Sequence, residues 1–227
     1  MVVAVHQPQY MPWLGYFAKL AAADHFVLLD SVQYKKNEWQ NRNRIKNGQG
    51  WQWLTVPVSY RFPMRIGEVA VDERQNWRTT HLRSIETNYR RAPFFAWLRP
   101  FLQSVYERPW ATIAELNGFV VREIAGLLGI STRIVAASEL GALPDDADER
   151  LIAIVRAVGG DVYLAGSGGR GYMDLEKWRR AGIEVRFQEY RHPVYPQLFG
   201  AFAANLSIVD LLCNCGPASL DILREHP

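Results

Sequence analysis

Two short apolar runs joined by a helical stretch constrain the start of this chain most strongly. Residues 2–5 form a β-branched run that ends at His6, and a second apolar run covers residues 26–29. Between them, apolar side chains recur at helical spacing over residues 13–23. Two strands joined by one helix are typical of a right-handed parallel crossover. We therefore expect the two strands to lie side by side in a parallel sheet.

The same alternation of strands and helices returns in the C-terminal part of the chain. The sequence predicts strands at residues 133–136, 162–165 and 184–188, and helices at residues 148–158, 174–181 and 207–212. Strands that alternate with helices form parallel sheets covered on both faces. We therefore expect an α/β fold with a Rossmann-like parallel sheet and helices on both faces.

The middle of the chain follows different patterns. Residues 31–72 form a β-rich insertion, because strand-like runs cover residues 51–58 and 68–71 and are separated by turn-forming residues. Residues 77–128 form a helical insertion, with helices expected at residues 77–90, 93–107 and 112–128. Since no repeat or linker divides the sequence, we expect a single α/β domain over residues 1–227 that contains both insertions.

Composition excludes several classes of protein. The 227 residues are 48% hydrophobic, yet no apolar run approaches the roughly 20 residues of a membrane-spanning helix, and no secretory signal opens the chain. We expect a cytoplasmic protein without a membrane span. The two cysteines, Cys213 and Cys215, cannot by themselves build a disulfide scaffold or a four-ligand zinc site.

The net charge of +3 is too balanced to indicate a nucleic-acid-binding protein. However, the stretch from Lys35 to Lys46 is strongly basic, and aromatic residues reach 12% of the chain. Cations interleaved with aromatic rings suit a nucleotide or a nucleotide-linked sugar. Tryptophans packed in the core beneath a solvated basic surface would explain the same counts. A tRNA partner is a weaker hypothesis, which steep salt dependence of binding would support.

The first candidate binding segment directly follows the first strand, where open α/β sheets bind ligands. It is stiffened by Pro8 and Pro12, so its polar and aromatic groups are ordered at little cost. Its candidate substrate-binding residues are Gln7, Gln9, Tyr10, Trp13 and Tyr16, and His6 is a candidate catalytic residue. Alternatively, His6 bonds only to the backbone and Trp13 belongs to the core.

The second segment follows the second strand, which ends at Asp30. This carboxylate could act as a catalytic base, hold a sugar hydroxyl or cap a turn. Further candidate substrate-binding residues are Gln33, Tyr34, Lys35, Asn41, Arg42 and Asn43. Lys35 and Arg42 are suited to neutralising phosphate. The alternative is a solvated basic hairpin.

The third segment is the glycine-rich stretch that follows the strand at residues 162–165. Its candidate binding residues are Gly166, Ser167 and Gly168. Their backbone amides could form an anion-binding nest, although a plain tight turn explains the glycines equally well. After the strand at residues 184–188, a proline-stiffened loop adds the candidates Gln188, Tyr190, His192 and Gln197.

Motif searches narrow the chemistry further. The sequence contains neither a Gly-x-Ser-x-Gly elbow nor a His-Glu-x-x-His motif, and it assigns no metal, cofactor or oligomeric state. His6 with His192 is the one histidine pair that we consider, as catalytic groups or as ligands brought together by the fold. We expect His6, Arg42 and the amides near Ser167 to converge on one cavity.

Together these segments resemble the WbqC-like family of bacterial proteins, which is often associated with O-antigen and other surface-polysaccharide gene sets. The matching segments are His6-Gln7-Pro8-Gln9-Tyr10, Pro12-Trp13-Leu14-Gly15-Tyr16-Phe17, Asp30, Val32-Gln33-Tyr34, Asn41-Arg42-Asn43, Gly166-Ser167-Gly168, Gln188-Glu189-Tyr190, His192-Pro193, Tyr195, Gln197 and Leu206-Ser207-Ile208-Val209-Asp210. The resemblance implies a transferase of lipopolysaccharide biosynthesis. Ser31 stands where a second aspartate would be expected, so the resemblance does not imply a pair of carboxylates here.

A weaker similarity concerns the loop and helix after the first strand. Their layout is similar to the His-x-Gly-His segment of nucleotidyltransferases and class I aminoacyl-tRNA synthetases, in which histidines contact triphosphate. Here Trp13 and Tyr16 occupy both histidine positions. This similarity favours a nucleotide-shaped ligand more than adenylyl transfer.

Our leading hypothesis is therefore a transferase that acts on a nucleotide-activated or amino sugar and moves an acyl, aminoacyl or glycosyl group. The alternatives are an activating enzyme similar to nucleotidyltransferases and a noncatalytic module that binds a sugar nucleotide or glycan.

Overall fold

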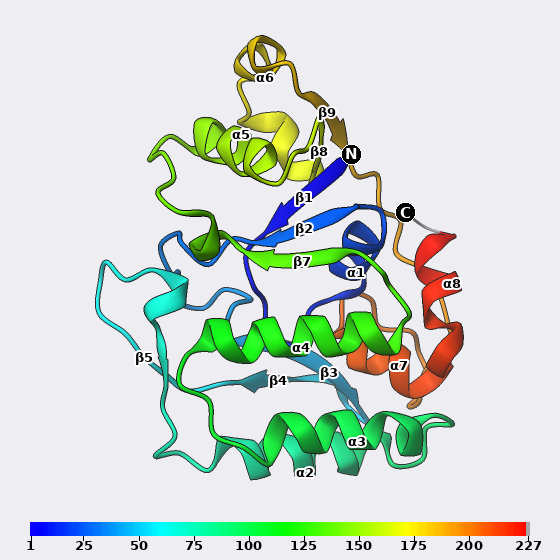
Figure 1. Cartoon of the computed structure of the whole chain (residues 1–227). Helices are drawn as coiled ribbons and strands as arrows, with labels where there is room; N and C mark the ends of the chain where they lie inside the picture. Colours follow the sequence, from blue (N-terminus) through cyan, green and yellow to red (C-terminus); the bar gives the residue numbers. More distant parts are fainter. Residues whose placement is uncertain (226–227) are drawn as a thin grey trace.

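The computed structural model describes residues 1–225 and is built around one parallel sheet (Figure 1). The strand order is β7-β2-β1-β8-β9. The strands are β1 (Val2–His6), β2 (His25–Leu28), β7 (Arg133–Ala136), β8 (Val162–Ala165) and β9 (Glu184–Phe187). All four strand pairs are parallel, so the carboxyl ends of the five strands meet at one edge.

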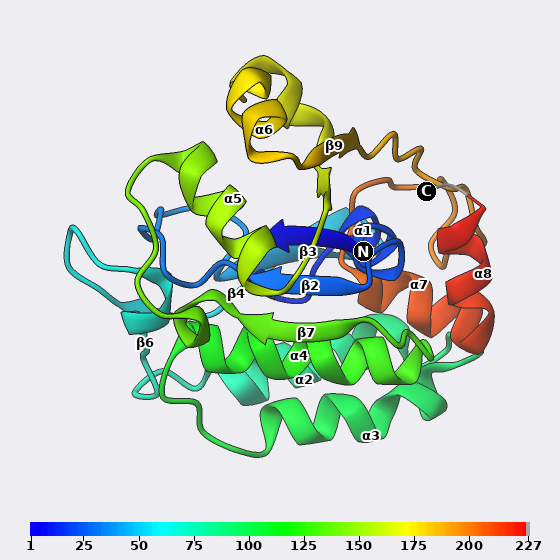
Figure 2. The same cartoon turned by 45° about the horizontal axis from the view of Figure 1, so that its top comes forward.

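Helices cover both faces of this sheet, as Figure 2 shows. One face carries α1 (Leu14–Ala21), α4 (Ile113–Leu127), α7 (Ile208–Cys215) and α8 (Ser219–Arg224). The other face carries α5 (Ala147–Ala157) and α6 (Leu175–Ala181). Alternate residues of β1 separate the two cores, because Ala4 packs with the first group and Val3 and Val5 with the second. The expected Rossmann-like α/β architecture is confirmed.

The order of the strands reverses in the middle of the sheet. Helix α1 leads from β1 to β2 on one face, whereas α6 leads from β8 to β9 on the opposite face. The loops after β1 and β8 therefore diverge and leave a crevice beyond the carboxyl ends of these adjacent strands. In open α/β sheets, ligands bind at such a point.

The helical insertion agrees closely with the prediction. Its helices are α2 (Trp77–Tyr89), α3 (Phe95–Tyr106) and α4, and all three contribute to the core on the α1 side of the sheet. Apolar residues recur along each of these helices, and this periodicity was sufficient to place them. Of the helices in the described part of the chain, none is long and apolar enough to cross a membrane.

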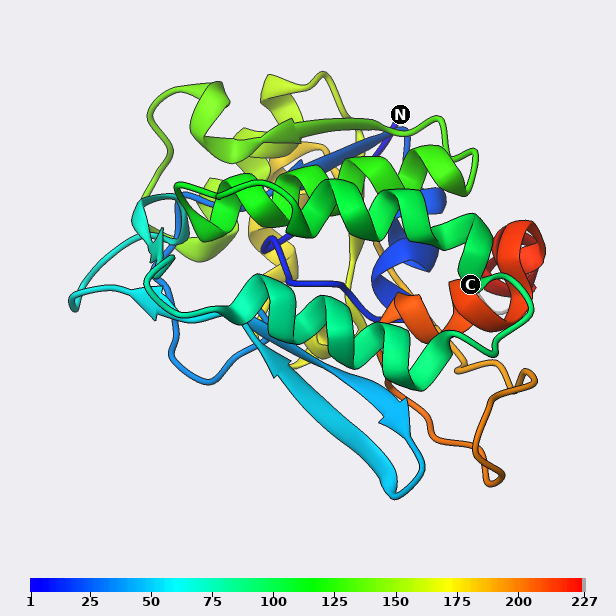
Figure 3. The same cartoon turned by 90° about the horizontal axis from the view of Figure 1, so that it is seen from below.

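The β-rich insertion differs in detail from the prediction. The run at residues 51–58 is divided between β4 (Gly50–Thr55) and β5 (Val58–Ser59), because Pro57 has no backbone N–H to continue the ladder. A polar strand that the sequence analysis did not place, β3 (Arg42–Asn47), pairs with β4 in a hairpin (Figure 3).

The expected strand at residues 68–71 is also shorter than predicted. Its first residue closes the 3-10 helix η1 (Ile66–Glu68), and only β6 (Ala70–Val71) pairs with β5. Three further 3-10 helices are η2 (Ala137–Leu140), η3 (Ser167–Gly171) and η4 (Gly216–Ala218). Helix α8 was not predicted, because its six residues are too few to show a clear period.

Candidate functional site

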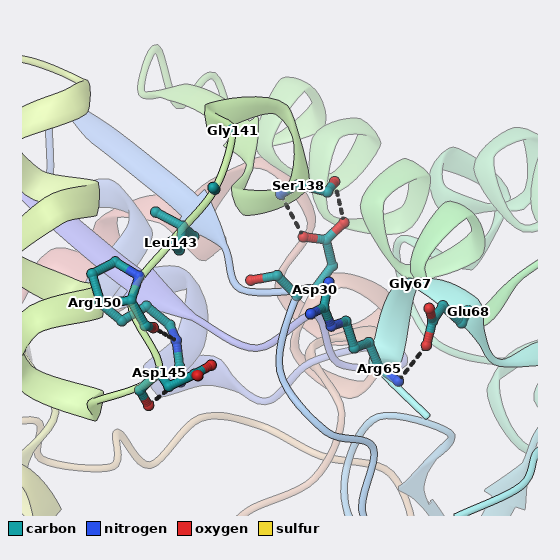
Figure 4. A pocket seen from close by; sticks show the side chains of 12 residues that line it. Asp30, Arg65, Gly67, Glu68, Ser138, Gly141, Leu143, Asp145 and Arg150 are labelled. Atoms are coloured by element: carbon teal, nitrogen blue, oxygen red, sulfur yellow. Dashed lines mark hydrogen bonds between the residues drawn. The ribbon is translucent and has the colours of Figure 1, made fainter. Parts of the chain in front are cut away.

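A groove lies beyond the carboxyl ends of β1, β2 and β7. It consists of two cavities of about 990 and 500 Å³. Both cavities are lined by Ser31, Arg65, Glu68, Asp145 and Arg150, so they form one continuous hollow, here called the carboxyl-edge groove. Figure 4 shows the smaller cavity, with Arg65 and Arg150 coming from opposite sides.

The topology explains why these residues meet. Gln7 follows β1, the stretch from Leu29 to Lys35 follows β2, and Tyr172 closes the η3 turn after β8. The start of α5 supplies Asp145 and Arg150. The remaining wall comes from the β-rich insertion, which lies across the sheet edge near η1 (Figure 1). The groove thus occupies the edge at which the fold favours a ligand.

Asp30 lies at the base of the smaller cavity and joins two strand ends. Its side chain is only 7% exposed, and its two carboxylate oxygens accept hydrogen bonds from the Ser138 backbone N–H (2.9 Å) and hydroxyl (2.6 Å). The Asp30 carboxylate therefore binds the first turn of η2, and its roles as a base or as a ligand of a sugar hydroxyl stay predictions. This bond fixes the loop after β7 against the end of β2.

Three cationic side chains line the groove, and they differ in whether other residues bind them. Within residues 1–225, the side chains of Arg65 and Lys35 form neither an ion pair nor a hydrogen bond, and both residues are exposed. Arg150 is held by the backbone carbonyl oxygens of Pro144 (2.9 Å) and Asp145 (2.6 Å). The groove therefore presents two unpartnered cations and one preoriented guanidinium.

His6 ends β1 but lies in a poorly solvated position. Its Nδ1 is 3.1 Å from the Gln7 carbonyl oxygen, and its ring lies 4.7 Å from that of Tyr16, measured between centroids. Burial, assisted by the positive charge of Lys19, lowers the pKa of His6 to about 3. The imidazole is consequently neutral at pH 7 and a weak proton acceptor.

Lys19 was not singled out in the sequence, where it is a lone lysine on an apolar helix. Its ammonium group is buried and donates a hydrogen bond to the Val5 carbonyl oxygen at 2.9 Å. Burial lowers the pKa of Lys19 to about 8. This lysine ties α1 to β1 and adds positive charge beneath the first loop.

The two tyrosines of the first loop and helix have no open ring face. Tyr10 is fully buried, and its hydroxyl lies 2.9 Å from His81 Nδ1 and 2.5 Å from the Tyr106 hydroxyl. Tyr16 is 1% exposed and packs against Phe26. In this conformation both rings belong to the core, so neither enters the proposals below.

The loop after β9 is held by a buried polar network. Asp210 accepts hydrogen bonds from the hydroxyls of Tyr89 and Tyr195 and from Gln197 Nε2, each at 2.8 Å. Gln197 Oε1 also accepts from Lys46 Nζ at 3.0 Å. These contacts give Gln197 a role in holding the loop.

His192 is engaged in the same loop. Its Nδ1 lies 2.8 Å from the Pro193 carbonyl oxygen, and its Nε2 accepts from the Asn205 backbone N–H at 3.0 Å. The ring packs against Tyr190 and Phe202. The pairing of His6 with His192 stays a prediction.

The residues around β3 support the first loop. Asn43 Nδ2 donates to the Met11 carbonyl oxygen at 2.7 Å, and Asn41 Nδ2 donates to the Val56 carbonyl oxygen at 2.9 Å. The Arg42 guanidinium lies 4.4 Å from the Trp53 ring centroid and donates to the Asn37 carbonyl oxygen. Its side chain is therefore directed along the hairpin.

The glycine-rich segment forms the short η3 turn. An added Cβ at Gly169 would lie 2.9 Å from Met173 Sδ, so the Met173 side chain would have to move, whereas Gly166 and Gly168 have open space around them. Nearby, Gln188 Nε2 donates to the Gly15 carbonyl oxygen at 3.1 Å. The segment reaches the groove through Tyr172.

The remaining candidates divide between two cavities. Gln33, Lys35, Gln7 and Asp30 line the carboxyl-edge groove. Tyr34 is buried beneath them and packs edge-on against Tyr60. Gln9 and Trp13 line a separate cavity, and the Trp13 ring meets that of Tyr190 edge-on at 5.2 Å.

Sequence reasoning therefore located one side of the groove and missed the other. His6, Arg42 and Ser167, expected on a common cavity, are absent from the lining of the groove, although Gln7 and Tyr172 carry their neighbouring segments to it. Arg65 and Arg150 had not been singled out. Across residues 1–225, no group of three or more His, Cys, Asp or Glu side chains is arranged to hold a metal ion.

Fold and groove together define a Rossmann-like α/β protein with a cavity lined by charged residues at the carboxyl edge of its sheet. The chain belongs to the WbqC-like protein family, which it matches over residues 7–222. It is also 38% identical over 226 residues to the uncharacterized protein Rv1507c of Mycobacterium tuberculosis (strain ATCC 25618 / H37Rv), covering 98% of this chain and 97% of that protein. No solved structure matches the chain significantly.

Proposed function

We propose that this protein is a transferase that acts on a nucleotide-activated or amino sugar in surface-polysaccharide biosynthesis, moving an acyl, aminoacyl or glycosyl group. Membership of the WbqC-like family supports a role in polysaccharide biosynthesis. The position of the groove at the carboxyl edge of the sheet supports a nucleotide-shaped ligand there.

The observation that carries the proposal is the set of cations in the groove. Arg65 and Lys35 have no partner among the described residues, and Arg150 is oriented by two backbone carbonyl oxygens. Phosphate oxygens accept charge-assisted hydrogen bonds from such groups, and arginine can bind them in bidentate fashion. In our proposal these three side chains hold the diphosphate of the donor.

The size of the groove suits a donor of this kind. Ligand cavities typically measure about 300–1,000 Å³. The larger cavity, at about 990 Å³, stands at the upper end of that range and opens into the smaller one. A nucleoside diphosphate would occupy the larger cavity, with the linked sugar directed toward Asp30.

Proton transfer in this proposal does not depend on a strong base. His6 is neutral, with a pKa of about 3, and both carboxylate oxygens of Asp30 are engaged by Ser138. A neutral amine attacks an electrophile before it loses its proton, so positioning supplies much of the acceleration. An amino sugar is therefore the acceptor that we favour.

The same observations favour one alternative, a noncatalytic module that binds a sugar nucleotide. A chain whose two best candidate bases are neutral or occupied can bind without turning its ligand over. The two functions differ in one readout, because only the transferase consumes the donor.

The test combines binding with turnover. We expect thermal denaturation to shift upward in the presence of UDP, GDP, CDP or dTDP, because a ligand of the folded state raises its stability. Incubation of the corresponding nucleotide sugars with amino-sugar acceptors should release a nucleotide when a glycosyl group moves. Incubation of nucleotide-linked amino sugars with acyl or aminoacyl donors should instead add the mass of the transferred group, and mass spectrometry follows both reactions. Binding without product would favour the noncatalytic module, and no shift with any nucleotide would contradict both.

A further inference from the structure

A second cavity lies on the other side of the first loop. It measures about 330 Å³ and is lined by Gln9, Trp13, Trp39, Arg44 and Asn205. We call it the tryptophan pocket. Its walls come from the loop after β1, the residue before α1, the turn before β3, β3 itself and the loop before α7. Segments distant in sequence thus converge on one hollow.

The pocket contains polar atoms that the fold leaves unsatisfied. Gln9 is 8% exposed, yet its Oε1 has no hydrogen-bond partner among the described residues. Nε of Arg44 is likewise buried and unpartnered, although its Nη2 donates to the Asn205 carbonyl oxygen at 3.0 Å. Unpaired buried polar groups are costly, so an acceptor and a donor on two residues that line one cavity point to a ligand that these atoms meet after a rotation of the two side chains.

The aromatic walls are held in place by their neighbours. The Trp13 indole lies over Gly15, where an added Cβ would come within 2.3 Å of the ring. Trp39 is 36% exposed, and the Arg44 guanidinium lies 5.8 Å from its centroid. The backbone of Trp39 is fixed by a 3.0 Å hydrogen bond from Tyr10 N–H to its carbonyl oxygen. The Trp13 indole is therefore fixed against α1, and the Trp39 indole adds a half-exposed apolar wall.

This donor set matches a sugar ring better than a phosphate or a nucleobase. Arg44 is the one cation in the lining, which is too few for a phosphate group, and its guanidinium is already packed on Trp51 at 4.8 Å. Sugar hydroxyls both donate and accept hydrogen bonds, and the apolar face of a pyranose packs on indole. The orphaned oxygen of Gln9 and nitrogen of Arg44 would each receive a hydroxyl.

We propose that the tryptophan pocket binds a pyranose unit of the acceptor glycan. The inference rests on the proposed transferase function, because it makes the bound ring part of the acceptor. Gln7 and Gln9 belong to the same short loop, so the loop separates the groove from the pocket. The pocket thus holds a nonreacting sugar of the acceptor while another unit enters the groove.

The experiment is saturation-transfer NMR on the full chain with methyl glycosides of glucose and N-acetylglucosamine at millimolar concentration. We expect signals from at least one glycoside with the wild type. Gln9→Leu removes the orphaned acceptor, so it should abolish the signal without lowering the temperature of unfolding. Trp39→Ala should also abolish it, whereas the control Trp51→Phe keeps a ring beside Arg44 and should preserve it.

The outcomes separate this inference from the proposed function. UDP serves as the probe for the groove, and its binding should weaken by about tenfold or more in Arg65→Ala but be retained in Gln9→Leu. Absence of any glycoside signal, or a signal that persists in Gln9→Leu, overturns the assignment of the pocket. Glycoside binding without binding of UDP, GDP, CDP or dTDP would instead overturn the proposed use of the groove. Destabilisation by Gln9→Leu would show that Gln9 has a structural role and would also overturn the inference.

Discussion

The polar network around Asp210 and the carboxyl-edge groove contain similar residue types. They differ in whether the polar side chains have hydrogen-bond partners within the protein. Asp210 is fully buried and accepts three hydrogen bonds from side chains, and Lys46 lies close by, held by Gln197. In the groove, Arg65 and Lys35 have no partner within residues 1–225. The first region uses its polarity to hold the fold, whereas the second leaves charge available to a ligand.

The energetic reason lies in the cost of burial. Burial raises the pKa of Asp210, while the donors around it oppose that rise. Removing one member of such a network leaves the others buried and unsatisfied. An exposed cation such as Arg65 is solvated in the absence of ligand, so its removal leaves no buried group without a partner. Mutations in the Asp210 network should therefore lower the stability of the fold, whereas mutations in the groove should weaken ligand binding and leave stability unchanged.

The largest effect is expected for Asp210→Ala. Because Tyr89, Tyr195 and Gln197 would lose a common acceptor, we expect the free energy of unfolding to fall by about 3–5 kcal/mol. Urea denaturation measures this change. Asp221→Ala, at an exposed position on α8, is the control and should stay within about 0.5 kcal/mol of wild type. Equal effects of the two substitutions would contradict the structural role of the network.

Arg65→Ala is expected to weaken ligand binding without destabilising the fold. We expect its affinity for UDP to fall by about tenfold or more, equivalent to about 1.4 kcal/mol, with no measurable loss of stability. Arg61→Ala is the matched control, because Arg61 is an exposed arginine of the same segment that does not line the groove. If both variants weaken UDP binding equally, general electrostatic attraction rather than the groove is responsible.

The stability of the fold should depend on pH, because two poorly solvated histidines are neutral in the folded chain. Burial lowers the pKa of His6 to about 3 and that of His81 to about 4, from 6.5. Below pH 6.5 the unfolded chain therefore binds more protons than the folded chain, so stability falls as the pH falls. Each histidine contributes a slope of about 1.4 kcal/mol per pH unit. Urea denaturation between pH 7 and 5 tests this, and His81→Gln should show a shallower dependence than wild type.

The smallest effect concerns Lys19→Met. The positive charge of Lys19 is the second cause of the lowered pKa of His6, after burial. Its removal should raise the pKa of His6 by less than about one unit, while the imidazole stays neutral at pH 7. NMR titration of the histidine ring measures this shift. An unchanged pKa would mean that burial alone keeps His6 neutral.

The sequence predicted the sheet better than the surrounding loops. The strands at residues 133–136 and 162–165 were located to the residue, because short apolar runs bounded by turn residues mark strands of a parallel sheet, both at the partly exposed edge (β7) and in the buried interior (β8). The strand β3 was missed because its alternating polar residues serve a hairpin rather than the main core. Periodicity reports burial, so it fails where a strand is supported by side-chain hydrogen bonds.

The candidate site was predicted on one wall only. Gln7 and Lys35 were found because strand ends meet at one edge of a parallel sheet. Arg65 was missed because its position depends on tertiary pairing of its segment with Gln33, which no local pattern reveals. Tyr10 has an aromatic ring and a hydroxyl that suit a ligand, but the ring is buried and the hydroxyl lies within hydrogen-bond distance of His81. Residue type alone cannot tell a satisfied group from an available one.

Calorimetric titration with UDP and with uridine tests the central claim most directly, because the two ligands differ only in the diphosphate that the groove cations are proposed to hold. The account predicts saturable binding of UDP to the wild type, binding of uridine that is weaker by about tenfold or more, and loss of this difference in Arg65→Ala. Equal affinities for UDP and uridine in the wild type, or an undiminished preference for UDP in Arg65→Ala, would contradict it.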